Sequence, residues 1–61
     1  MKKILRGDLV EIIYQSTSYD PLLGLVLGVS DIYGRQFFYV RYTQEGYTDN
    51  RWINEKFIKR P

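Results

Sequence analysis

The residues able to carry out acid–base, nucleophilic or metal chemistry are few in this sequence. It contains no histidine and no cysteine, which removes imidazole catalysis, thiolate nucleophiles, disulfides and the usual zinc sites. Asp8 follows a glycine in turn-like sequence, Glu11 fits a solvated strand face, and Asp20 begins an Asp-Pro turn. We therefore expect no catalytic, cofactor-binding or metal site and a protein that is not an enzyme. An active site assembled from several chains at a symmetry axis is the one enzymatic arrangement left open.

Aromatic side chains beside an arginine offer a different chemistry, which is binding. Phe37, Tyr39 and Arg41 alternate with a second set of side chains that includes Phe38 and Val40. In a strand the two sets face opposite sides, and we assign the set with Val40 to the core. The other set then forms an outer surface suited to stacking or to a protein-binding hot spot. The alternative is that the first loop folds over this surface.

Two leucines and the single tryptophan extend this expected surface. A strand in which Val26 faces inward places Leu25 and Leu27 outward. Trp52 either provides a platform for stacking or fills the core or rim of the fold. An outward apolar set indicates a covered face, hence a second copy of the chain or another protein. The predicted protein-interaction residues are Leu25, Leu27, Phe37, Tyr39, Arg41 and Trp52.

Basic residues gather at the two ends of the chain, although the net charge is only +2. Residues 7 to 55 carry three arginines against seven acidic residues. If the first and last strands lie close together, the basic ends form one patch that could contact phosphates, with an affinity that falls as salt rises. The alternative is that terminal charges serve solubility. The candidate phosphate contacts are Lys2, Lys3, Arg6, Lys59 and Arg60.

The elements that must position these residues are short strands. Leu9 to Tyr14 predicts a strand with Val10, Ile12 and Tyr14 on one face. After Gly28 the alternation of the next strand slips by one residue, which predicts a β-bulge. The remaining predicted elements are a loop at Gln15 to Pro21, a hairpin link at Tyr33-Gly34-Arg35, strands at 37–42 and 47–53, a helical turn at 54–56 and a closing strand at 57–60.

This pattern predicts an all-β fold, with residues 1–61 forming one domain. We expect a small five-stranded antiparallel barrel with a long first loop and one short helical turn before the last strand. The chain has no apolar run near the 18 or so residues of a membrane span, and Arg6 and Asp8 interrupt any signal-like segment at its start. We therefore expect a cytoplasmic protein without membrane insertion.

Several motifs follow the predicted strands, namely Gly7-Asp8-x-Val10-x-Ile12, Gly24-x-Val26-x-x-Val29, Phe38-x-Val40-x-Tyr42, Trp52 and Phe57-Ile58. Together they resemble the Src-homology-3-like small barrels, including their KOW, Tudor and phage variants. The family of small ferredoxin-docking barrels of photosystem I looks similar in Arg6-Gly7-x-x-Val10-x-Ile12, Ser18-Tyr19, Val40-Arg41-Tyr42 and Tyr47. That second resemblance implies docking of an acidic electron carrier such as ferredoxin, with Arg6 and Arg41 as contacts.

The favoured interpretation is a non-enzymatic interaction module that docks on a protein partner, as part of a larger microbial or phage assembly. The partner is either a different protein or a second copy. The first alternative is a nucleic-acid-binding module that uses the basic ends and the exposed aromatics. The second is the electron-carrier docking role implied by the resemblance.

Overall fold

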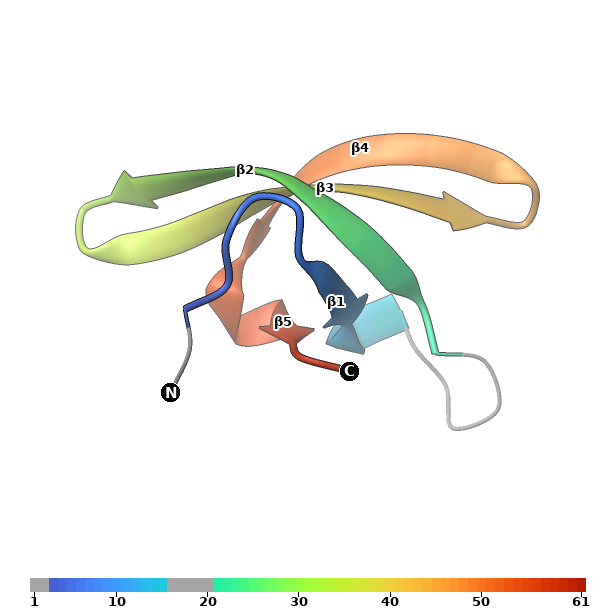
Figure 1. The fold of residues 1–61 in the computed structure, drawn as a ribbon, viewed down its shortest axis with the longest axis horizontal. Helices are drawn as coiled ribbons and strands as arrows, with labels where there is room; N and C mark the ends of the chain where they lie inside the picture. The colour runs from blue at the N-terminus through green and yellow to red at the C-terminus, as the bar shows by residue number, and fades with distance from the viewer. Residues whose placement is uncertain (1–2, 16–20) are drawn as a thin grey trace.

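The protein folds into one curled antiparallel sheet, seen in a computed structural model that describes residues 3–15 and 21–61 (Figure 1). Its elements are β1 (Leu9–Ile12), η1 (Ile13–Gln15), β2 (Leu23–Ile32), β3 (Arg35–Gln44), β4 (Tyr47–Asn54), η2 (Glu55–Phe57) and β5 (Ile58–Lys59). The five strands lie in the order β4-β3-β2-β1-β5 and form a half-barrel, which confirms the predicted all-β fold. Most of the predicted first loop, residues 16–20, lies outside the described residues, as does Lys2.

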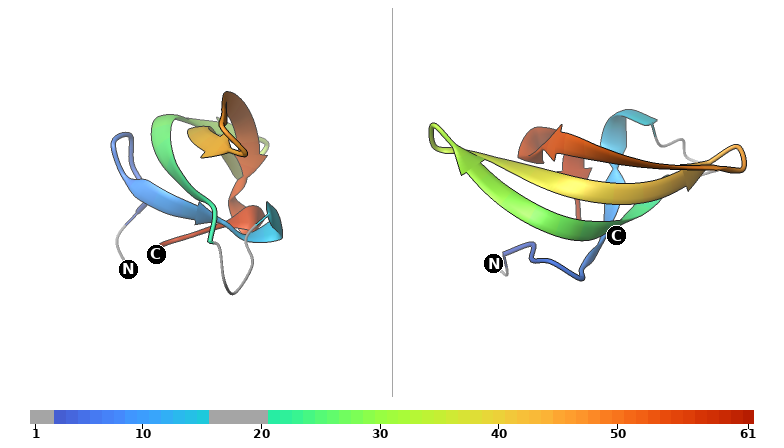
Figure 2. Two further views of the ribbon diagram at one scale, coloured as in Figure 1. Left: turned by 90° about the vertical axis from the view of Figure 1, so that its right-hand side faces the viewer. Right: turned by 90° about the horizontal axis from the view of Figure 1, so that it is seen from above.

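Two tight hairpins join the three long strands. Tyr33 and Gly34 have φ angles of 52° and 76°, and Glu45 and Gly46 have φ angles of 52° and 82°. Positive φ at both central residues is the signature of the type I′ turn, whose twist matches that of paired strands. The first link is therefore two residues long, and Arg35 belongs to β3. Figure 2 shows the two hairpin tips at opposite ends of the molecule.

A bulge bends β2 where the sequence predicted it. The β2–β3 register shifts between Val26 and Gly28, which leaves Leu27 as the extra residue. Beside the bend, the Gly7 amide donates to the Val26 carbonyl at 2.8 Å, and the Val26 amide donates to the Asp8 carbonyl at 2.9 Å. The segment before β1 thus follows the bent strand, and the sheet curls around its concave side.

The core lies on that concave side. Phe38 and Val40 face it from the middle of β3, as the alternation predicted. Gly24 of β2 lies against Val40 so closely that a Cβ atom there would meet Val40 Cγ1 and lie 3.1 Å from the Arg41 carbonyl oxygen. The buried core residues are Val10, Ile12, Leu22, Val26, Phe38, Val40, Tyr42, Ile53 and Ile58.

Two residues that were predicted to lie in strands lie outside them. The sequence placed Tyr14 on the buried face of the first strand, but β1 ends at Ile12 and Tyr14 is 46% exposed in η1. Phe57 was expected to open the closing strand, but it lies in η2, one residue before β5. The Asn54 side chain caps η2 by accepting a hydrogen bond from the Lys56 amide at 3.1 Å, so the turn begins one residue later than predicted.

The two ends of the chain meet in the sheet. β1 pairs with β5 through Glu11 opposite Lys59 and Ile12 opposite Ile58. The first and last strands are therefore neighbours, as the charge argument assumed. In the parts of the chain that the structure describes, no helix is both long and apolar enough to cross a membrane.

Candidate binding site

The convex side of the sheet carries an aromatic pair. Tyr39 of β3 lies opposite Trp52 of β4, and their ring centroids are 5.0 Å apart at an interplanar angle of 38°. Trp52 remains 54% exposed, so it does not fill the core. Gly28 leaves room beside this pair, because a Cβ atom there would lie 3.8 Å from Trp52 Cη2. The two rings form an accessible aromatic surface.

The other predicted interaction residues lie around this pair. Leu25 is opposite Arg41, and both are exposed. Phe37 is half-buried two residues before Tyr39, on the same side of β3. Leu27 is half-buried at the bulge and has no cross-strand partner in β3. We use the name outer face for the convex surface formed by Leu25, Ser30, Ile32, Phe37, Tyr39, Arg41 and Trp52.

A hollow of 480 Å³ opens on the outer face. Ser30, Ile32, Phe37 and Trp52 line it, and Ile32 is 49% exposed. Sequence reasoning named Phe37 and Trp52 but missed Ser30 and Ile32. Counting back from the Tyr33-Gly34 turn, which sets Ser30 opposite Phe37, would have found both. Because Ser30 is the one hydroxyl or charged side chain among the described residues that line it, this hollow suits an apolar group rather than an ion.

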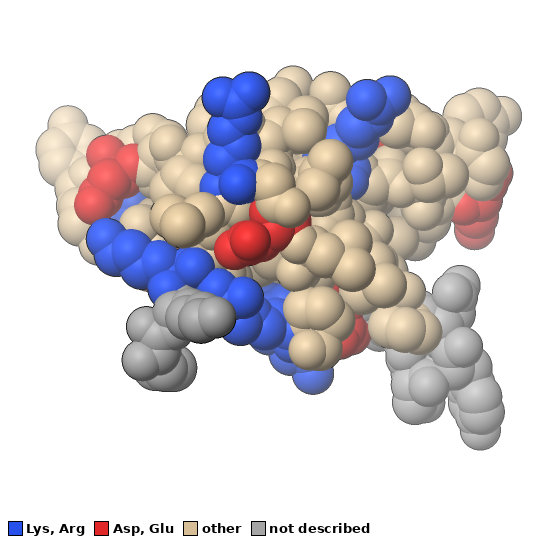
Figure 3. Space-filling model, in the orientation of Figure 1, with Lys and Arg blue, Asp and Glu red and all other residues tan. Residues whose placement is uncertain are grey.

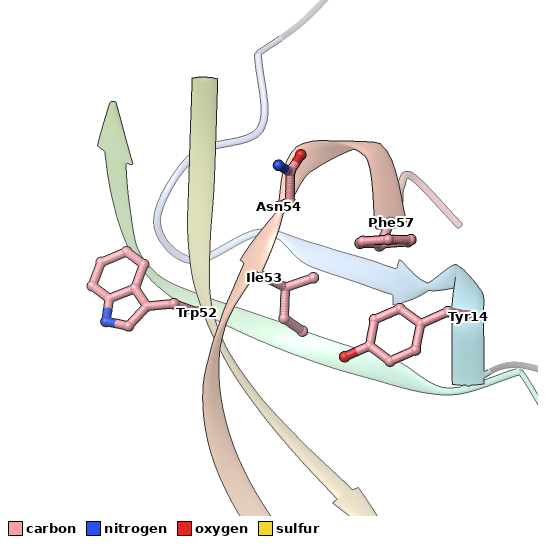
Figure 4. Close-up of a pocket in the computed structure, with 5 residues that line it drawn as sticks. All are labelled: Tyr14, Trp52, Ile53, Asn54 and Phe57. Atoms are coloured by element: carbon pink, nitrogen blue, oxygen red, sulfur yellow. The ribbon is translucent and has the colours of Figure 1, made fainter. Parts of the chain in front are cut away.

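A second hollow, of 320 Å³, lies beside the two 3₁₀ turns (Figure 4). Tyr14 and Phe57 form one wall in an edge-to-face arrangement, with ring centroids 5.0 Å apart. Lys56 Nζ lies 5.0 Å from the centroid of the Phe57 ring, which is cation–π distance. Figure 4 shows the Trp52 ring directed away from Tyr14 and Phe57, so this residue borders both hollows. The sequence missed this site because it assigned Tyr14 to the core.

Arg51 stands on the concave side of β4, opposite Val40. Its Nε lies 3.6 Å from Asp49 Oδ2. The Tyr42 side chain, then a hydrogen bond with Tyr14 and the charge of Asp49, raise the pKa of Arg51, which therefore stays charged. Burial raises the pKa of the Tyr42 hydroxyl, with the positive charge of Arg51 acting in the opposite direction. Asp49 and Arg51 thus form an acidic and a basic group side by side on β4.

The basic ends lie together but are not uniformly positive. Arg60 Nη2 donates to the Lys3 carbonyl at 2.6 Å and lies 3.6 Å from Asp8 Oδ2. Lys59 Nζ is 3.7 Å from Glu11 Oε1. Figure 3 shows acidic side chains between the blue ones on this face. Among the predicted phosphate contacts, Lys59 and Arg60 therefore have acidic partners within the fold.

No group of three or more His, Cys, Asp or Glu side chains that could hold a metal ion occurs within residues 3–15 and 21–61. Comparisons of the chain with protein-family models, with curated proteins and with solved structures gave no significant match. The curled five-stranded sheet is consistent with a small β-barrel. Membership of the Src-homology-3-like barrels and the likeness to the ferredoxin-docking barrels of photosystem I stay predictions.

Proposed function

We propose that the protein is a non-enzymatic binding module that docks on a protein partner through the outer face, as one component of a larger assembly. The observation that supports this is Trp52, which packs against Tyr39 yet is more than half exposed, at the border of two apolar hollows. Tryptophan, tyrosine and arginine dominate the energetics of protein interfaces. Arg41 on the same face completes this set.

The geometry favours an extended segment as the partner's contacting element. The outer hollow accepts one or two apolar side chains, and Arg41, on the same side of β3, accepts an acidic group. The contact between Tyr39 and Trp52 restricts both rings before binding, which lowers the entropy lost on association. A peptide with apolar residues close to an acidic residue matches these features.

Trp52 makes the test direct, because it is the single tryptophan of the chain. Peptides are selected from a displayed random library on the immobilised protein and then titrated into isotope-labelled protein. For the wild type we expect peptide binding to change the Trp52 fluorescence and to shift the amide signals of β3 and β4. The Trp52→Ala variant should neither enrich peptides from the library nor bind those selected on the wild type. Tyr33→Ala is the matched control, because Tyr33 is a fully exposed aromatic residue at a hairpin tip. Selected peptides that bind Trp52→Ala as tightly as the wild type contradict the proposal.

Nucleic-acid binding is the second candidate, supported by the placement of Arg41 on the same face as the aromatic pair of Tyr39 and Trp52. Single-stranded nucleic acid binds to such combinations through base stacking and phosphate contacts. Titration with a mixed-sequence DNA oligonucleotide at low and moderate salt separates the two functions. Binding that falls steeply with salt and is lost in a variant with Lys3, Arg6, Lys59 and Arg60 all changed to Ala favours nucleic acid. Affinity for a plant-type ferredoxin, with none for DNA, favours the electron-carrier alternative instead.

A further inference from the structure

β4 stands at one edge of the sheet. In the described parts of the chain β4 pairs with β3 alone, and it stands at the end of the strand order. Its residues 47–52 are all exposed. Figures 1 and 2 show it as the outermost strand of the β3–β4 hairpin, whose tip projects away from β1 and β5. An edge strand of this kind offers its main-chain groups to another strand.

We propose that two copies of the chain pair through antiparallel β4 strands, with the two-fold axis at Asn50, so that the two sheets become one. Residues that flank a two-residue turn, here Gln44 and Tyr47, form a hydrogen-bonded pair. Such pairs alternate with non-hydrogen-bonded pairs along an antiparallel ladder. The main-chain groups of Thr48, Asn50 and Trp52 therefore point away from β3, toward the free edge. In the single chain the Asn50 amide donates to Asp49 Oδ1 at 2.8 Å. A two-fold axis at Asn50 uses the main-chain groups of all three residues, and the Asn50 amide then exchanges its bond to Asp49 for one to the carbonyl of the partner's Asn50.

The charged residues of β4 favour the register that has the two-fold axis at Asn50. With Asn50 opposite its own copy, Asp49 lies opposite the partner's Arg51, and Arg51 lies opposite the partner's Asp49. Because Asp49 and Arg51 already lie 3.6 Å apart within one chain, the four groups form a ring of alternating charge. Axes at Asp49 or at Arg51 place like charges opposite each other, which is destabilising.

The same register gives an apolar contact on the outer face, where Thr48 lies opposite the partner's Trp52. On the concave side Tyr47 lies opposite the partner's Ile53, whose side chain is buried in its own core. Tyr47 is 80% exposed in the single chain and so has much surface to bury. The joined sheet also brings the two outer faces side by side. The inference does not depend on what the outer face binds.

Sedimentation velocity from micromolar to millimolar concentration tests the pairing. We expect a concentration-dependent dimer for the wild type and a monomer for Asp49→Arg and for Arg51→Asp, because each places like charges opposite each other. Mixing these two variants restores opposite charges at every position and should give a heterodimer. Asp31→Arg is the matched control, since Asp31 is exposed on β2, away from β4, and its dimer should be unchanged.

Cysteine cross-linking tests the register, because the natural chain has no cysteine. Opposed residues of a hydrogen-bonded pair have Cα atoms about 5.5 Å apart, within the range of a disulfide. Asn50→Cys should therefore oxidise to a covalent dimer, whereas Thr48→Cys should not, because it faces position 52 of the partner. A wild type that stays monomeric over the whole range overturns the proposal. A dimer that survives both charge reversals, or that cross-links at position 48 in place of 50, overturns it as well.

Discussion

Two glycines of β2 provide a matched pair of substitutions that tests the packing of the sheet. In Gly24→Ala the new methyl group would meet Val40 Cγ1 and lie 3.1 Å from the Arg41 carbonyl oxygen. Val40 is fully buried and β-branched, so it cannot swing aside. In Gly28→Ala the nearest atoms are Tyr39 Cβ at 3.7 Å and Trp52 Cη2 at 3.8 Å, which are ordinary contacts.

The two substitutions should change the free energy of unfolding in opposite directions. Overpacking lowers the free energy of unfolding by about 1–3 kcal/mol. Alanine also reduces the entropy of the unfolded chain, which raises the free energy of unfolding by about 0.4–1 kcal/mol. Gly24→Ala should therefore lower it by about 1–2 kcal/mol. Gly28→Ala creates no close contact, so only the entropy of the unfolded chain changes, and the free energy of unfolding should rise by about 0.4–1 kcal/mol. In a domain of this size each kcal/mol corresponds to about 8 °C in Tm.

The assay is thermal and urea unfolding of both variants and the wild type, followed by circular dichroism and by Trp52 fluorescence. The two variants should move in opposite directions, with Gly24→Ala melting about 8–15 °C below the wild type. Equal stability of Gly24→Ala and wild type would refute the close approach of β2 to Val40. A loss in Gly28→Ala as large as that in Gly24→Ala would show that both effects come from the backbone rather than from packing.

Three further predictions concern the tyrosines and the start of the chain. Burial raises the pKa of Tyr42, so the folded state holds this proton more tightly than the unfolded state. The free energy of unfolding should therefore decrease as the pH rises above about 10. Urea unfolding of Tyr42→Phe should show a smaller decrease over the same pH range. The Asp8 carboxylate accepts a hydrogen bond from the Leu5 amide at 2.8 Å, so Asp8→Ala should cost about 1 kcal/mol and speed hydrogen exchange at that amide; unchanged exchange contradicts this. A double-mutant cycle of Tyr14→Ala and Phe57→Ala should give a coupling of about 0.5–1.5 kcal/mol, and purely additive losses would show that the two rings do not interact.

Alternation along the chain predicted the centre of the fold but not the ends of its strands. The spacing of Phe38 and Val40 identified the core, and the phase slip at Gly28 identified the bulge. Tyr14 continued the same alternation, yet it leaves the sheet. The reason lies in β5, whose pairing with β1 ends at Ile12 opposite Ile58, directly after η2. The next pair in this register would join Ile13 to Phe57, but Phe57 belongs to η2, so the first strand ends and the chain turns away. The alternation within the first strand gives no information about where its neighbouring strand ends.

The outer face was predictable in part. Phe37 and Tyr39 follow from alternation with the core residues of β3, and Trp52 joins them because the two-residue turn at Glu45-Gly46 fixes the β3–β4 register. The hollow beside Tyr14 and Phe57 was not predictable, because both of its walls depend on where strands end.

The pairing of β1 with β5 has a consequence for how quickly the protein folds. β2, β3 and β4 meet through turns of two residues, so their contacts form at little cost in chain entropy. The ladder between β1 and β5 instead joins opposite ends of the chain, and Ile58 completes the buried core only when it forms. The barrier to folding therefore contains the entropy of bringing the ends together, which slows folding relative to a meander of hairpins alone.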